Sequence, residues 1–180
     1  MDSGVGTTHL AVATANYVAN EWGIPAAVVE LASRPCIRHL DTDQSGAAYF
    51  VEDGVGYYPH VMSGRLPMML NGDYSYLIMD LGSAESEWQE FLRCDLRYLV
   101  ASLSPWRVAQ AEKFMVAHTQ PDGMEHMHQK YFTALLTVTG NVYEKKRFQQ
   151  LYHVPVRSVP FMADPFRLDK DQLAFFQELL

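Results

Sequence analysis

Hydrophobic residues along the chain follow two spacings, one typical of helices and the other of buried strands. Apolar positions recur every three or four residues within the segments 7–22, 85–93, 106–118, 143–152 and 170–180. Short, nearly continuous apolar runs lie between them, at 26–31, 74–81, 98–103, 132–138 and 156–161. Such runs are typical of parallel strands that are covered on both faces. The alternation therefore predicts an α/β fold with a mostly parallel sheet and helices on both faces.

The segment 33–72 departs from this alternation because it shows no helical spacing. Within it, two apolar runs at 47–51 and 55–61 flank Glu52-Asp53-Gly54, a turn sequence that predicts a β-hairpin. We find no internal repeat, low-complexity tract or linker anywhere in the sequence. We therefore expect residues 1–180 to form a single domain.

Composition and charge narrow the class of protein. The chain has 180 residues, of which 48% are hydrophobic and 19% charged, so it can bury a core. Its net charge of −7 argues against nucleic acid as a partner, and Lys145-Lys146-Arg147 is typical of a solvated helix face. No apolar run reaches the roughly 18 residues of a membrane helix, and the first residues do not resemble a signal peptide. We expect a cytoplasmic protein without direct membrane insertion.

Two groups of residues offer reactive side chains but lack the neighbouring residues that catalysis or metal binding would need. Cys36 and His39 are spaced like a nucleophile and its base, yet no orienting acid is recognisable. His126-Met127-His128 follows Glu125 but has no evident third metal ligand, which favours a solvated surface loop. With Cys94 as the only other cysteine, the chain has too few thiols for a disulfide framework.

The segment Gly4-Val5-Gly6-Thr7-Thr8 lies directly before the first predicted helix. Glycines allow backbone N–H groups to curl around an anion, and a helix N-terminus adds partial positive charge. A hydroxyl in the first helical turn can complete the coordination of Mg²⁺. Because glycines before a helix also serve as simple turns, these residues alone leave both phosphate binding and a structural turn open.

In their order along nearly the whole chain, the motifs resemble those of the MinD/ParA family of P-loop NTPases, the SIMIBI class. Residues 4–8 resemble the second half of its deviant P-loop, K-G-G-x-G-K-[ST], and 76–82 resemble its Walker B strand. Residues 136–141 resemble the strand ending in an asparagine that contacts adenine, and 159–165 resemble the loop beside that base. The resemblance implies a three-layer P-loop NTPase-like fold, with the pilus-localisation branch called TadZ or CpaE as the nearest relatives.

The resemblance also implies ligands and site residues. Nucleotide would contact Gly4, Val5, Gly6, Thr7, Thr8, Asn141 and Pro160. Mg²⁺ would be held by Thr8 and Asp80, with ATP as the nucleotide. Weak binding and an empty loop both remain open, because the backbone amides survive while the main cation is gone. Asn141 can equally act as a helix N-cap, a position that asparagine favours.

Three departures from the family pattern concern catalysis. The P-loop lysine would fall at Thr7, the signature lysine at Asp2, and the carboxylate that helps to position water at Ala32. Phosphoryl transfer depends on positioning and charge stabilisation, so we expect no efficient NTP hydrolysis. The family's central first strand also has no equivalent, because only Met1-Asp2-Ser3 precedes Gly4. Either this strand is missing and its place is filled otherwise, or the natural start lies upstream.

These features favour a degenerate nucleotide-binding or pseudo-ATPase domain that acts as an interaction or localisation module in pilus or secretion assembly. It would work as a homodimer or with a protein partner. One alternative is an active ATPase or GTPase switch completed by a partner residue, and another is a small-molecule kinase or synthetase. By chain position, the arginines nearest the site are Arg34, Arg38 and Arg93.

The closing segment 170–180 bears on membrane attachment. It is net acidic, so anionic lipid would repel it. We expect its apolar residues Leu173, Phe176 and Leu180 to pack on the sheet instead.

Overall fold

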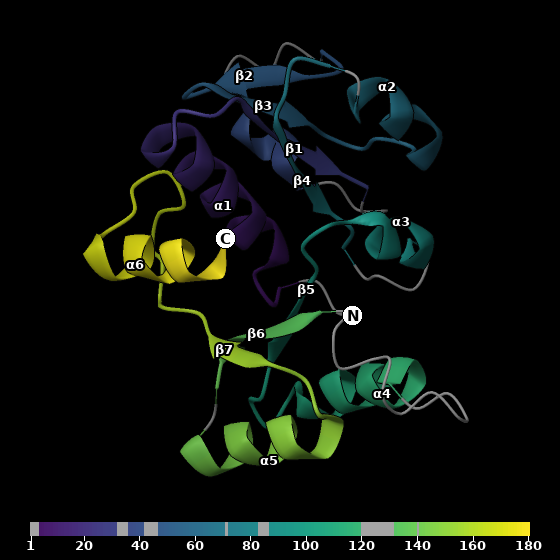
Figure 1. Ribbon diagram of the computed structural model, residues 1–180, viewed down its shortest axis with the longest axis vertical. Coiled ribbons are helices and arrows are strands. Elements are labelled where there is room, and N and C mark those ends of the chain that lie inside the picture. The colour runs from purple at the N-terminus through teal and green to yellow at the C-terminus, as the bar shows by residue number, and fades with distance from the viewer. Residues whose placement is uncertain are drawn as a thin grey trace. The chain divides into compact units, whose positions relative to one another are not determined.

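The computed structural model describes residues 4–31, 36–41, 47–70, 72–82, 87–119, 132–139 and 141–180 (Figure 1). The chain divides into two compact units. Unit 1 contains Met1–Gly6 and Trp88–Phe161, and unit 2 contains Thr7–Glu87 and Met162–Leu180. The single domain over residues 1–180 stays a prediction.

Unit 2 is built on a four-stranded sheet with the order β2-β3-β1-β4. Its strands are β1 (Ala26–Glu30), β2 (Phe50–Glu52), β3 (Val55–Tyr58) and β4 (Tyr76–Asp80). Strand β1 pairs in parallel with β3 on one side and β4 on the other, and every residue of β1 is buried. Strands β2 and β3 pair antiparallel, which confirms the hairpin predicted around Glu52-Asp53-Gly54.

Two helices of unit 2 pack on this sheet or on each other. Helix α1 (Thr7–Glu21) packs on β1, β3 and β4. Helix α6 (Lys170–Leu179) begins at the capping box of Asp169 and Gln172. Its Phe176 stacks on Tyr17 of α1, with ring centroids 5.3 Å apart. We expected this helix to pack on the sheet, but its aromatic contact is with α1, which already covers the strands.

Short helices occupy the segment in which the sequence shows no helical spacing. They are the 3₁₀ helices η1 (Ile37–Leu40) and η2 (Ser63–Arg65) and the α-helix α2 (Leu66–Leu70), which follows η2 directly. Each is too short to display the 3.6-residue period, so the sequence pattern could not predict them.

Unit 1 contains a three-stranded parallel sheet with the order β5-β6-β7. Its strands are β5 (Tyr98–Ser102), β6 (Thr133–Val138) and β7 (Val156–Ser158), and its helices are α3 (Trp88–Arg93), α4 (Val108–Thr119) and α5 (Val142–Tyr152). Helix α4 packs on β5, and α5 connects β6 with β7 (Figure 1). Trp88 of α3 contacts Phe114 of α4 edge to face, with ring centroids 6.2 Å apart.

Parallel strands joined by helices in both units confirm the predicted α/β class with mostly parallel pairing. Within the described ranges, β4 and β5 each have a paired neighbour on one side only. Whether a central first strand is missing stays a prediction. No helix in these ranges is long and apolar enough to cross a membrane.

Candidate functional site

The loop before α1 has a backbone that favours glycine at two positions. Gly4 and Gly6 have φ values of +99° and +91°, in the region that other residues rarely adopt. Val5 between them is buried, and α1 begins at the next residue, Thr7. A Cβ placed on Gly6 would lie 3.6 Å from the methyl carbon of Thr137 in β6. The loop therefore lies near the carboxyl end of β6, the side of a parallel sheet where ligands usually bind.

The two residues predicted to hold Mg²⁺ are in direct contact. Thr8 Oγ1, in the first turn of α1, donates a hydrogen bond of 2.5 Å to Asp80 Oδ2 at the end of β4. The second carboxylate oxygen, Oδ1, accepts from the Gly82 N–H at 2.9 Å, and Asp80 is only 1% exposed. A hydroxyl and a carboxylate are oxygen donors of the kind that Mg²⁺ prefers, with phosphate and water as its usual remaining ligands. The pair therefore fits a phosphate-bound Mg²⁺.

Glu30, at the end of β1, is a buried carboxylate beside this pair. It stands opposite Asp80 in the β1–β4 register and is fully buried. Its oxygens accept the Cys36 N–H at 2.5 Å and the Ile37 N–H at 3.3 Å. Burial raises the pKa of Glu30, the two N–H groups oppose that shift, and the Asp80 carboxylate adds to it. Glu30 thus fixes the start of η1, a structural role that we did not predict from the sequence.

Asn141 is the N-cap of α5. Its Oδ1 accepts the Glu144 N–H at 2.9 Å, while Glu144 Oε2 accepts the Asn141 N–H at 3.1 Å. This capping box confirms one of the two roles that the sequence left open, and the adenine contact stays a prediction. Pro160 is half-buried and follows β7 by two residues. Asn141 and Pro160 therefore follow the carboxyl ends of β6 and β7 in unit 1.

An arginine that the sequence analysis did not select lies beside the loop. A Cβ placed on Gly4 would be 3.2 Å from Arg107 Nη2. Arg107 lies in the turn between β5 and α4, where the Ser104 carbonyl accepts the N–H groups of Arg107 and Val108, each at 2.9 Å. Its position just after a parallel strand is the sequence signal that could have identified it.

The arginines proposed from chain position have other surroundings. Arg38 Nη1 donates to the Ala47 carbonyl at 3.3 Å, and Arg93 pairs with Glu90 at 3.1 Å. Arg34 lies outside the described residues, as do Asp2, Ala32 and the His126–His128 loop. Among the residues that are described, no group of three or more His, Cys, Asp or Glu side chains could hold a metal ion.

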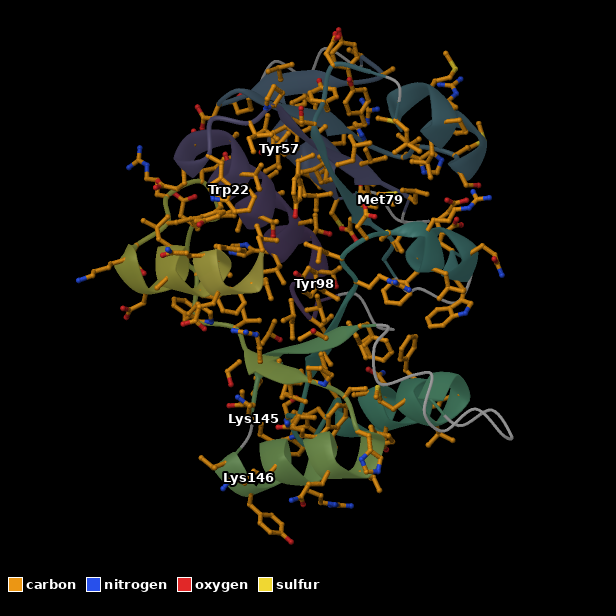
Figure 2. The ribbon with its side chains drawn as sticks, viewed as in Figure 1. Trp22, Tyr57, Met79, Tyr98, Lys145 and Lys146 are labelled. Atoms are coloured by element: carbon orange, nitrogen blue, oxygen red, sulfur yellow. The ribbon has the colours of Figure 1, made fainter. Side chains whose placement is uncertain are left out.

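The cationic triplet lies on α5, as expected of a solvated helix face. Lys146 and Arg147 are exposed, and Lys145 Nζ donates to Ser158 Oγ at 2.8 Å (Figure 2). Lys145 thereby links α5 to β7, which follows it in the chain.

Comparison with solved structures identifies the fold. A chain of the MinC:MinD cell division protein complex of Aquifex aeolicus matches with a TM-score of 0.62 and 14% identity, over 99% of this chain and 92% of that one. MinD of Aquifex aeolicus matches with a TM-score of 0.56 and 15% identity, over 97% and 81%. A third match is cobyrinic acid a,c-diamide synthase of Mycobacterium smegmatis, solved with a bound ATP analog and magnesium. Its TM-score is 0.55 and its identity 16%, over 98% of this chain and 88% of that one. No family model and no curated protein sequence matches. The chain therefore has a MinD/ParA-like P-loop fold.

Proposed function

We propose that this chain is a degenerate nucleotide-binding domain that binds the phosphates of ATP with Mg²⁺ but does not hydrolyse ATP efficiently. The contact between Thr8 and Asp80 carries the proposal, because it joins the start of α1 to the end of β4. The hydroxyl belongs to the second residue after Gly6 in the chain, and the carboxylate that it contacts is buried. The fold supports the proposal, since a solved structure with this fold contains a bound ATP analog and magnesium.

Binding relies on groups that do not depend on a lysine. With φ values near +90°, Gly4 and Gly6 allow the loop backbone to turn its N–H groups towards an anion. The N-terminus of α1, at Thr7, adds the partial positive charge of the helix. When bound, Mg²⁺ would neutralise phosphate charge, and Thr8 and Asp80 would hold it.

Hydrolysis requires groups that this sequence lacks. Thr7 stands at the position of the family's P-loop lysine, and its hydroxyl carries no charge to stabilise the transferring phosphoryl group. Loss of a single transition-state donor typically costs about 3 kcal/mol of the barrier. The domain then acts through its bound state, as an interaction module in a homodimer or with a protein partner. Its place in pilus or secretion assembly, and in the cytoplasm, rests on the sequence resemblance and composition.

Calorimetric titration with Mg-ATP and Mg-GTP tests binding. The wild-type chain should bind Mg-ATP, and Thr8→Ala should remove the Mg²⁺-dependent part of the affinity. Thr8→Ser is the matched control, because it keeps the hydroxyl that contacts Asp80 and should bind like the wild type. Absence of binding, or equal binding by the alanine and serine variants, contradicts the proposal.

Phosphate release tests the catalytic half of the proposal. The wild-type chain should hydrolyse ATP no faster than the Thr8→Ala/Asp80→Ala double variant. Turnover clearly above that control would instead favour an active switch whose cation comes from a partner. Light scattering with and without Mg-ATP then shows whether the bound form is a dimer.

A further inference from the structure

Arg107 of unit 1 lies directly against the glycine loop. From the position that a Cβ on Gly4 would take, Nη2 is 3.2 Å away, Nη1 3.9 Å and Cζ 4.0 Å. The end of the guanidinium group therefore faces the loop backbone. Arg107 is half-buried, and the turn that carries it is fixed by two backbone hydrogen bonds to the Ser104 carbonyl.

The absence of a side chain at Gly4 makes this approach possible. A contact of 3.2 Å is tighter than most real Cβ contacts, so a side chain at position 4 would push the end of Arg107 away by a few tenths of an ångström. A φ value of +99° independently favours glycine there. Glycine at position 4 therefore does two things: it leaves room for the guanidinium group of Arg107, and it allows the positive φ of the loop backbone.

The chemistry of arginine suits a phosphate ligand at this loop. A guanidinium group is always charged and offers a planar fork of donors that matches two phosphate oxygens. The loop itself has no cation at Thr7, where the family resemblance implies a lysine. A cationic side chain held against Gly4 can supply positive charge for binding phosphate, although it comes from the turn after β5.

We infer that Arg107 is the phosphate-binding cation of this domain and contacts the phosphates of a nucleotide bound at the glycine loop, residues 4–6. The inference rests on the proposed function, since it concerns the same loop. It extends that function because the positive charge that contacts the phosphates comes from this chain and not from a partner protein. It also defines the ligand class, because Arg107 would recognise nucleoside di- and triphosphates and pyrophosphate but not an uncharged nucleoside.

Calorimetry on three variants of the full chain tests the assignment. Arg107→Gln should weaken Mg-ATP binding at least about tenfold, in line with the strength of a charged hydrogen bond. Arg107→Lys should retain part of the affinity, because it keeps the charge but not the fork. Arg147→Gln is the matched control: it removes the same charge from an exposed position on α5 and should leave binding unchanged.

A purely structural role of Arg107 predicts a different result. Each titration is repeated at several salt concentrations, because salt weakens a direct contact between a guanidinium group and phosphate. Loss of that contact should make Mg-ATP binding by Arg107→Gln less sensitive to salt than binding by the wild type. Thermal unfolding of each variant shows that it is folded. An unchanged salt dependence means that Arg107 only supports the loop and overturns the assignment.

Failure of this inference can be distinguished from failure of the proposed function. If the wild-type chain binds neither Mg-ATP nor pyrophosphate, the proposed function is wrong and the inference falls with it. If the wild-type chain binds Mg-ATP and Arg107→Gln binds it within twofold, the loop is a phosphate site without help from Arg107. Only the assignment of Arg107 is then overturned.

Discussion

Replacing Gly6 with alanine separates the conformational role of the loop from its binding role. The new Cβ would lie 3.6 Å from the Thr137 methyl carbon, an ordinary contact distance, so no steric overlap is expected. The cost comes from the φ value of +91°, which an L-residue adopts with about 1 to 2 kcal/mol of strain. For a chain of this length, that cost lowers the melting temperature by about 2 to 8 °C.

Gly54→Ala provides the matched control. Gly54 lies in the turn between β2 and β3 with a φ value of +77°, and its Cβ would have no neighbour within 4 Å. Thermal unfolding should therefore show a similar loss of stability in both variants. Titration with Mg-ATP should separate them, because only the methyl group at Gly6 lies in the proposed phosphate loop. We expect at least a tenfold loss of affinity for Gly6→Ala and none for Gly54→Ala.

Two results would refute this reasoning. If Gly6→Ala is as stable as the wild type, the loop can adopt another backbone conformation and the positive φ is not required. If both variants lose equal stability and bind Mg-ATP like the wild type, residues 4–6 form only a turn. The second result would also remove the basis for nucleotide binding at the start of α1.

Three further predictions concern other parts of the chain. Asn141→Ser should keep the melting temperature, because serine also caps helices. If the amide contacts adenine, the same substitution should reduce the preference for ATP over GTP. An unchanged ratio of the two dissociation constants means that Asn141 is only a cap. Phe176→Ala should lower the free energy of unfolding by about 3 to 5 kcal/mol, because its fully buried ring stacks on Tyr17. A loss below about 1 kcal/mol in a denaturant titration would show that the packing of α6 contributes little to stability. Burial raises the pKa of Tyr57 to about 12, so the folded state keeps a proton that the unfolded state loses above pH 10. Unfolding at pH 9 to 11.5 should therefore show stability falling as pH rises in the wild type, and less so in Tyr57→Phe.

The strands and the glycine loop could be predicted from the sequence because each leaves a local pattern. Strand β1 is buried on both faces, and Ala26–Val29 form an unbroken apolar run before Glu30. Strand β4 is half-buried up to Met79, but it is also an apolar run, and it ends at the buried Asp80. A buried carboxylate is costly unless it is hydrogen-bonded or paired, so Asp80 indicates a site at the end of the strand. Glycines followed by two threonines mark the start of α1. Local propensity, burial and chemistry agree at these positions.

Contacts between distant segments could not be predicted in the same way. Arg107 comes close to Gly4 because of the way unit 1 packs, and no spacing in the sequence encodes that neighbour. No sequence pattern predicts the contacts of Glu30, whose oxygens accept the N–H groups of Cys36 and Ile37. Both interactions depend on which chain segments meet, and a periodic pattern carries information only about one segment at a time.

The stacking of Phe176 on Tyr17 has a consequence for the order in which the chain can fold during synthesis. The two residues are 159 positions apart (176 − 17), so the face of α1 around Tyr17 waits for almost the whole chain to be made. At typical rates of about 5 to 20 residues per second, this delay lasts roughly 10 to 30 s. The strands of unit 1 lie within the continuous segment Trp88–Phe161 and can pair earlier. A nascent chain should therefore be able to pair the strands of both sheets before α6 arrives and covers α1.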